Sequence, residues 1–116
     1  MANQQQTYQN YINGAFEHAS EHIEVFNPAN GELLSRVPES KSVEVERALD
    51  AARSAQKSWA RKPAIERATY LHKIADKLRS NVQQLARIIT MEQGKISALA
   101  EVEVNFTADY LDYMAE

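Results

Sequence analysis

Hydrophobic and polar positions alternate in short runs over the first third of the chain. Apolar pairs flank Asn13-Gly14, a dipeptide suited to a type I′ turn because both residues tolerate positive φ. Two further extended runs, 23–26 and 32–37, flank Asn27-Pro28-Ala29-Asn30-Gly31, whose proline, asparagines and glycine favour chain reversal. The pattern therefore predicts a β-hairpin region over residues 11–38.

Apolar residues recur at helical spacing in the remaining residues, 39–116. Ser42 is placed to cap the first helix, and Pro63 suits the start of the second. Ser80 to Gln83 has the form of a capping box, which predicts a break and a restart, and Gly94 suits a helix C-terminus. The predicted fold class is α+β, with N-terminal β-hairpins followed by three to four amphipathic helices in one incomplete domain.

The two ends of the chain differ from the amphipathic pattern of the segments between them. The polar start, residues 1–10, is expected to be disordered or frayed. The last helical segment is apolar on two faces, which indicates neighbours on both sides. One stripe comprises Leu99, Val102, Phe106, Tyr110 and Tyr113, and the other comprises Val104, Ala108, Leu111 and Ala115. We expect the first stripe to pack against the preceding helices, and the second to be left in water for a partner or a second copy.

Composition and charge exclude several classes of protein. The chain has 116 residues and a net charge of −3, so it fits one small domain and lacks the basic surface of a nucleic-acid binder. No apolar run is long enough to span a membrane, and the N-terminus has no secretion signal. Because there is no cysteine, the chain has no disulfide, thiolate zinc site or thiol nucleophile. A cytoplasmic location is the default expectation.

Few residues form patterns that suggest chemistry. His18, Glu21 and His22 form H-x-x-E-H, the motif of inverted zinc metallopeptidases, which requires a rigid helix. Here the motif lies between predicted strands, so a solvated loop is the preferred interpretation and zinc binding is the alternative. Asp109 and Asp112 are interpreted as a solvated helix face. The three glycines are too far apart in sequence to form a phosphate-binding loop.

The order of these elements resembles the N-terminal region of the NAD(P)-dependent aldehyde dehydrogenase superfamily. The resemblance covers nearly the whole chain. It rests on Tyr11-Ile12-Asn13-Gly14, Phe26-Asn27-Pro28-Ala29-Asn30-Gly31-Glu32, Val45-Glu46-Arg47-Ala48 with Ala51-Ala52 and Trp59, Glu66-Arg67-Ala68, and Thr90-Met91-Glu92-Gln93-Gly94-Lys95. The tail, residues 100–116, is most similar to the bacterial branch that acts on lactaldehyde and glycolaldehyde.

This resemblance implies part of a cofactor-binding domain without its active site. Family members use NAD or NADP, attack the aldehyde with a cysteine thiolate, transfer hydride and hydrolyse the thioester. The cysteine, the oxyanion-hole asparagine, the general-base glutamate and the Rossmann-like sheet would all follow Glu116, so no catalytic residue, cofactor or activity is expected for this chain alone. A monovalent cation site is implied at Glu92 together with the carbonyl of Phe26 or its neighbour Val25.

Three hypotheses for function remain at this point. The first is an N-terminal portion of an aldehyde dehydrogenase, from a truncated gene or an engineered expression segment, whose partner is the remainder of that enzyme. The second is a stand-alone helical interaction module that docks, or self-associates, through its last helix. The third is the metallopeptidase suggested by His18, Glu21 and His22. No nucleic-acid or membrane partner is expected.

Overall fold

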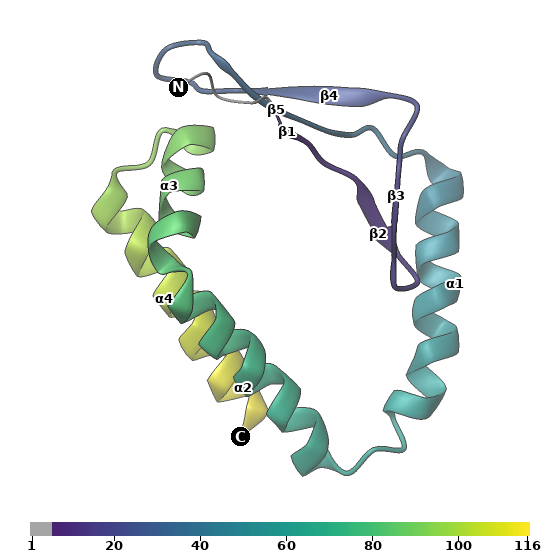
Figure 1. Ribbon diagram of the computed structural model, residues 1–116. Helices are drawn as coiled ribbons and strands as arrows, with labels where there is room; N and C mark the ends of the chain where they lie inside the picture. The colour runs from purple at the N-terminus through teal and green to yellow at the C-terminus, as the bar shows by residue number, and fades with distance from the viewer. Residues whose placement is uncertain (1–5) are drawn as a thin grey trace. The chain divides into compact units, whose positions relative to one another are not determined.

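The computed structural model describes residues 6–116. The chain forms two compact units, and the boundary in the sequence lies between Arg61 and Lys62. Unit 1 contains all the strands and the first helix, and unit 2 contains the other three helices (Figure 1). The α+β class and the order of hairpins before helices are confirmed. The first helix belongs to unit 1, so the boundary between the units lies after it. The domain bounds expected from the sequence stay a prediction.

Five short strands pair into two small sheets in unit 1. They are β1 (Gln6–Thr7), β2 (Asn10–Ile12), β3 (Ala15–Glu17), β4 (His22–Phe26) and β5 (Leu33–Pro38). β2 and β3 form one antiparallel hairpin. β4 pairs antiparallel with β5, and β1 pairs parallel with the other edge of β5. Both predicted hairpins are therefore confirmed.

The two hairpin turns have the geometry that their sequences predict. Asn13 and Gly14 have φ values of 52° and 81°, as a type I′ turn requires. In the second turn, Asn27 Oδ1 accepts the Ala29 N–H at 2.9 Å, and the Gly31 N–H donates to the Asn27 carbonyl at 2.8 Å. Local side-chain and main-chain hydrogen bonds thus reverse the chain without a hydrophobic core beneath them.

The segment before the first hairpin differs from its predicted disorder. Gln6–Thr7 pairs with β5, and the Tyr8 N–H donates to the Arg36 carbonyl at 2.8 Å. Asn10 begins β2, and its side chain exchanges hydrogen bonds with the Ser40 hydroxyl at 2.8 and 3.1 Å. Strand pairing uses main-chain N–H and C=O groups, so a strand can form in a segment whose side chains are polar and give no strand signal. Residues 1–5 lie outside the described residues, and for them disorder stays a prediction.

The first helix, α1, spans Ser42–Trp59. Ser42 is its first residue rather than its cap. Lys41 occupies the cap position, and its N–H donates to Glu44 Oε2 at 2.9 Å. Arg47 of α1 forms an ion pair with Glu17 at the end of β3, which joins the helix to the first hairpin. The apolar stripe of α1 is exposed, since none of the helix's residues is buried.

Unit 2 consists of α2 (Ala64–Ser80), α3 (Val82–Gln93) and α4 (Ser97–Ala115). The predicted break lies at Asn81, but no capping box forms there, because the Ser80 hydroxyl donates back to the Lys77 carbonyl. Gly94 ends α3 with φ of 72°, as predicted for a glycine C-terminus. Within residues 6–116, no helix is at once long and apolar enough to cross a membrane.

The core lies where α4 packs against α2 and α3 (Figure 1), and it is made of small residues. On α4 the buried residues are Ala100, Val104 and Ala108, whereas the stripe containing Phe106 is exposed. Our prediction of which face packs inward was therefore wrong. Small side chains let helix axes approach closely, so the alanine face was the one that could pack. Ile65 of α2 is also exposed.

Candidate functional site

A histidine and an arginine of α2 contact two aspartates of α4. His72 and Arg79 lie two turns apart on one face of α2, and Asp109 and Asp112 lie one turn apart on α4. His72 Nδ1 is 2.7 Å from Asp112 Oδ1. Arg79 Nη2 donates to Asp112 Oδ2 at 2.6 Å and to Asp109 Oδ1 at 2.7 Å. Asp112 is partly buried between these partners, so its interpretation as part of a solvated face is corrected, whereas Asp109 keeps most of its side chain in solvent.

The electrostatics of this cluster indicate a structural connection. Hydrogen bonding to His72, and then to Arg79, holds the pKa of the Asp112 carboxyl below its usual range. Asp109, and then Asp112, raise the pKa of the Arg79 guanidinium. Each Asp112 oxygen is engaged by one partner on α2. The cluster therefore links α2 to α4 at the edge of their contact.

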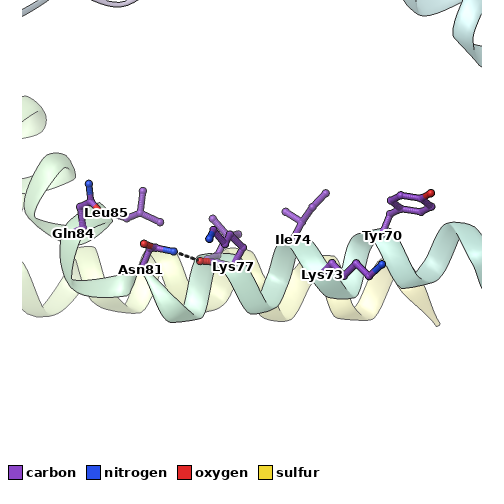
Figure 2. A pocket seen from close by; sticks show the side chains of 8 residues that line it. Tyr70, Lys73, Ile74, Lys77, Asn81, Gln84 and Leu85 are labelled. Carbon is purple, nitrogen blue, oxygen red and sulfur yellow. Dashed lines mark hydrogen bonds between the residues drawn. The ribbon is translucent and has the colours of Figure 1, made fainter. Parts of the chain in front are cut away.

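A groove of about 610 Å³ lies along α2 and the start of α3. Figure 2 shows its side chains extending from one side of the two helices. The lining residues are Tyr70, Lys73, Ile74, Lys77, Leu78, Asn81, Gln84 and Leu85. No motif singled out in the sequence predicted this face. The four-residue spacing of Tyr70 and Ile74 was the signal that could have found it.

The edge of this groove is basic. The Lys73 ammonium lies 5.6 Å from the centroid of the Tyr70 ring, a cation–π arrangement. Among the described residues, neither Lys73 nor Lys77 forms an ion pair through its ammonium group. The groove thus offers an apolar floor beside two positive charges with which no carboxylate of residues 6–116 pairs.

The exposed face of α4 has the opposite character. We call it the α4 stripe; its members are Leu99, Val102, Phe106, Tyr110 and Tyr113, each more than half exposed. Glu103 and Asp109 lie on its two flanks, as helical geometry places them about 60° to either side of Phe106. Glu103 pairs with Lys95, and Asp109 pairs with Arg79 while keeping most of its side chain in solvent. The α4 stripe is an apolar surface with an acidic border.

The residues implied for a monovalent cation lie in separate units. Val25 and Phe26 end β4 in unit 1, beside a shift in the strand register. Glu92 lies exposed near the end of α3 in unit 2. No cluster of three or more His, Cys, Asp or Glu side chains suited to a metal occurs within residues 6–116. The cation site stays a prediction.

The residues of the H-x-x-E-H motif lie in a loop and a strand, not a helix. His18 to Glu21 connect β3 to β4, and His22 begins β4. Both ring nitrogens of His18 lie within 3.0 Å of Gln9 Nε2, and Glu21 pairs with Lys41 at 3.0 Å. The predicted loop is confirmed, and the carboxylate that a peptidase would use as base faces an ammonium group. The absence of zinc stays a prediction.

The sequence of this chain is similar to those of a known protein family. The sequence matches the profile of the Aldehyde dehydrogenase family over residues 16–116. The chain belongs to the aldehyde dehydrogenase family. It is 46% identical, over 108 residues, to lactaldehyde dehydrogenase of Escherichia coli (strain K12), a match that spans 91% of this chain and 22% of that protein. The NADP-dependent glyceraldehyde-3-phosphate dehydrogenase of Streptococcus equinus is 38% identical over 109 residues, or 94% of this chain and 23% of that protein.

Solved structures of family members share the fold. The crystal structure of Escherichia coli lactaldehyde dehydrogenase matches with a TM-score of 0.92 and 43% identity, over 96% of this chain and 24% of that one. The NADP complex of the glyceraldehyde-3-phosphate dehydrogenase from Bacillus halodurans C-125 matches with a TM-score of 0.91 and 31% identity, over 94% of this chain and 23% of that one. The chain corresponds to the N-terminal part of these enzymes and spans less than a quarter of their length.

The glycines of this chain do not form a phosphate-binding loop. Gly14 and Gly31 lie in hairpin turns, and Gly94 ends a helix, so none of the three begins a helix where a phosphate could bind. The sequence also holds no cysteine to act as the nucleophile. The absence of catalytic and cofactor-contacting residues from this chain stays a prediction.

Proposed function

We propose that this chain is the N-terminal part of an aldehyde dehydrogenase that oxidises a small hydroxyaldehyde of the lactaldehyde type, with NAD or NADP as acceptor, in the cytoplasm. The single observation that carries the proposal is the likeness to Escherichia coli lactaldehyde dehydrogenase in both sequence and fold. That enzyme is more similar to this chain than the glyceraldehyde-3-phosphate dehydrogenases are. The nucleophile, the general base and the cofactor site would come from sequence outside these 116 residues.

The role of the chain itself in this proposal is structural. Unit 2 places small residues in its core and leaves large apolar side chains on two outer faces, the groove and the α4 stripe. A contiguous exposed apolar face of this kind is typical of a surface that another part of a protein covers. The remainder of the dehydrogenase is the occupant that the family assignment favours. Alone, the chain is expected to be catalytically inactive.

A chimeric enzyme tests this proposal. In full-length Escherichia coli lactaldehyde dehydrogenase, the matching N-terminal segment is replaced by this chain, and lactaldehyde-dependent reduction of NAD is measured. We expect activity within about tenfold of the parent enzyme, because the fold is shared and kcat/KM falls tenfold for each ~1.4 kcal/mol of lost transition-state stabilisation. The chimera carrying Val104→Glu is the matched control and should be inactive, since Val104 is buried in the helix core.

The isolated chain provides a second measurement. With lactaldehyde or glycolaldehyde and either nicotinamide cofactor, the purified 116-residue protein should give no turnover above background. Turnover that survives purification away from host dehydrogenases would overturn the assignment of an inactive segment. An inactive chimera, in which the chain is nevertheless folded, would contradict the structural role.

A stand-alone interaction module is the second candidate, and the exposed α4 stripe favours it. The DNA that follows the codon for Glu116 discriminates between the two. A reading frame that continues into a glycine-rich phosphate-binding segment and a cysteine supports the dehydrogenase. An unrelated downstream gene, together with an inactive chimera, supports the module.

A further inference from the structure

We propose that Asn13 is a site of spontaneous deamidation, and that the negative charge formed there weakens the contact of the first hairpin with α1. The chain contains two Asn-Gly sequences, Asn13-Gly14 and Asn30-Gly31, and both lie exposed in the turns of unit 1. Asparagine is thermolabile. A following glycine makes it more so, because glycine has no side chain to hinder attack by its main-chain nitrogen. Since both sites are exposed, access to water does not distinguish them.

Deamidation begins when the Gly14 main-chain nitrogen attacks Cγ of Asn13. The new C–N bond closes a five-membered succinimide ring, while the side-chain nitrogen takes up the Gly14 N–H proton and leaves as ammonia. Water then opens the ring at one of its two carbonyl carbons, which gives either aspartate or isoaspartate. Water is consumed and ammonia is released, so the step needs no oxidant, reductant or enzyme.

Hydrogen bonds protect the second Asn-Gly sequence. Asn30 Nδ2 donates to Glu32 Oε2 at 3.0 Å, and Asn30 Oδ1 accepts the Glu32 N–H at 3.0 Å. The nucleophile is engaged as well, because the Gly31 N–H donates to the Asn27 carbonyl at 2.8 Å. Attack at Asn30 therefore requires several hydrogen bonds of this turn to break first.

The first Asn-Gly sequence has no such protection. Within residues 6–116, neither the Asn13 side chain nor the Gly14 N–H forms a hydrogen bond. Ring closure needs a main-chain ψ that a type I′ turn does not have, so this turn must open before the nitrogen can reach Cγ. Opening is easy here, because β2 and β3 pair over three residues each and none of those residues is buried. Asn13 is therefore the reactive site.

A carboxylate at position 13 would lie beside other carboxylates. α1 lies next to this hairpin (Figure 1), and the two form a hollow of about 400 Å³ whose lining includes Asn13 and Glu17 of the hairpin and Arg47 and Asp50 of α1. Arg47 already pairs with Glu17. A third carboxylate is therefore repelled by Glu17 and Asp50 without a free cation in the lining of this hollow. Isoaspartate also lengthens the main chain by one methylene group, which a two-residue turn does not accommodate.

The purified 116-residue chain contains both the site and its control. It is incubated in mildly alkaline buffer, and the loss of the amide at Asn13 and at Asn30 is followed in the same sample by peptide mapping with mass spectrometry. We expect Asn13 to react at least about tenfold faster than Asn30, a ratio that corresponds to ~1.4 kcal/mol. In concentrated urea the two rates should become similar, because both turns are then open.

Two variants at Glu32 test whether its side chain protects Asn30. Glu32→Ala removes the acceptor of the Asn30 Nδ2 group and should raise the rate at Asn30 several-fold, whereas Glu32→Gln keeps an acceptor oxygen and should leave that rate close to its original value. Neither variant should change the rate at Asn13.

The effect of the new charge is measured with Asn13→Asp, which carries the carboxylate of the product. Because Asp-Gly also suits a type I′ turn, this variant isolates the charge from the turn. It should lower the melting temperature at low salt, and by less at high salt, where the repulsion is screened. Asp50→Asn in the same chain should restore most of the loss, since it removes one of the repelling carboxylates.

Three results would overturn the proposal. The first is an Asn13 amide that survives in the folded chain as long as the Asn30 amide does. The second is a difference in rate that persists in urea, which would assign it to the neighbouring sequence and not to the two turns. The third is an Asn13→Asp variant that melts like the unchanged chain at low salt. None of these results bears on whether the chimeric dehydrogenase is active, so the two proposals fail separately.

Discussion

Unit 1 and unit 2 are of similar length but are stabilised in different ways. In unit 1, within residues 6–61, the only buried residue is the polar Ser35, and the strands are joined by main-chain ladders and two defined turns. In unit 2, five apolar residues are buried where three helices meet. They are Ala75, Ala86, Ala100, Val104 and Ala108. Main-chain ladders and turn geometry therefore stabilise unit 1, whereas buried side chains stabilise unit 2.

This difference shows why the chain displays so much apolar surface. The unit 2 core contains four alanines and one valine, and no large side chain is fully buried anywhere in the described residues. Burying a large aliphatic or aromatic side chain stabilises a fold by roughly 1.5–3 kcal/mol. The side chains that could contribute most, on α1, on the groove and on the α4 stripe, contribute least here. They are available to another surface.

The largest effect should come from charging the core of unit 2. Val104 is 5% exposed, so Val104→Glu would bury an unpaired carboxylate and should lower the free energy of unfolding by roughly 3–5 kcal/mol. Urea denaturation followed by circular dichroism measures this. Ile65→Glu on exposed α2 surface is the control, with a change within about 0.5 kcal/mol. A similar small change for Val104→Glu would mean that α4 does not pack as described.

Enlarging the small core residues should have the next largest effect. Ala108 is fully buried, and Ala108→Leu should cost roughly 1–3 kcal/mol because the added atoms hold α4 away from its neighbours. The matched control is Ala98→Leu, on an exposed position of the same helix. Thermal unfolding of both variants gives the comparison. Equal stabilities would show that small size at this contact is not required.

Turn glycines should matter in both units to a similar, smaller degree. Gly14 has φ of 81°, and a Cβ there would meet no atom within 4 Å, so Gly14→Ala isolates the cost of the left-handed backbone. We expect a loss of about 1 kcal/mol, and the same for Gly94→Ala at the end of α3. Asn13→Gly, which keeps positive φ accessible, is the control. An unchanged melting temperature for Gly14→Ala would show that the first hairpin adds nothing to unit 1.

The smallest effect should be a dependence on pH that differs between the units. The pKa of Asp112 is lowered by His72 and Arg79, so its stabilising contribution is complete above the ordinary pKa of about 3.9. That contribution is lost as the pH falls through the lower pKa of the folded state. The contribution of Glu44 to unit 1 depends on pH in the same direction, because the hydrogen bond from the Lys41 N–H lowers the pKa of the Glu44 carboxyl.

Melting temperatures measured between about pH 2 and 6 separate these two contributions. Asp112→Asn should flatten the acid dependence of unit 2, and Glu44→Gln should flatten that of unit 1. If Asp112→Asn leaves the acid profile unchanged, the contacts of its carboxylate with α2 do not contribute to stability.

Local signals predicted the elements well. Asn13-Gly14 predicted its hairpin because few dipeptides accept two positive φ values, and Gly94 predicted a helix end for the same reason. The predictions that failed concerned groups without a strong local preference. Gln6–Thr7 forms a strand through main-chain pairing with β5, which is distant in sequence. Ser80 forms no capping box because its hydroxyl donates to the Lys77 carbonyl instead.

The candidate site was harder to predict. Asp112 meets His72 and Arg79 from 33 to 40 residues away, and no spacing within either segment indicates that meeting. Lys73, Ile74 and Lys77 line one groove together with Gln84 and Leu85 because α3 follows α2 after a short break at Asn81. The family resemblance, by contrast, was visible in the sequence, because it rests on short local motifs at fixed spacing.

The α4 helix separates what the sequence determined from what the tertiary structure decided. The sequence alone determined that this helix has two apolar faces, because helical spacing of Leu99 to Tyr113 and of Val104 to Ala115 is a local property. Only the tertiary structure decided which face is buried. α2 and α3 approach the face of Ala100, Val104 and Ala108, because helix axes come closest where side chains are small. The larger and more hydrophobic stripe is left outside, since what decides burial is the fit to the neighbouring helices.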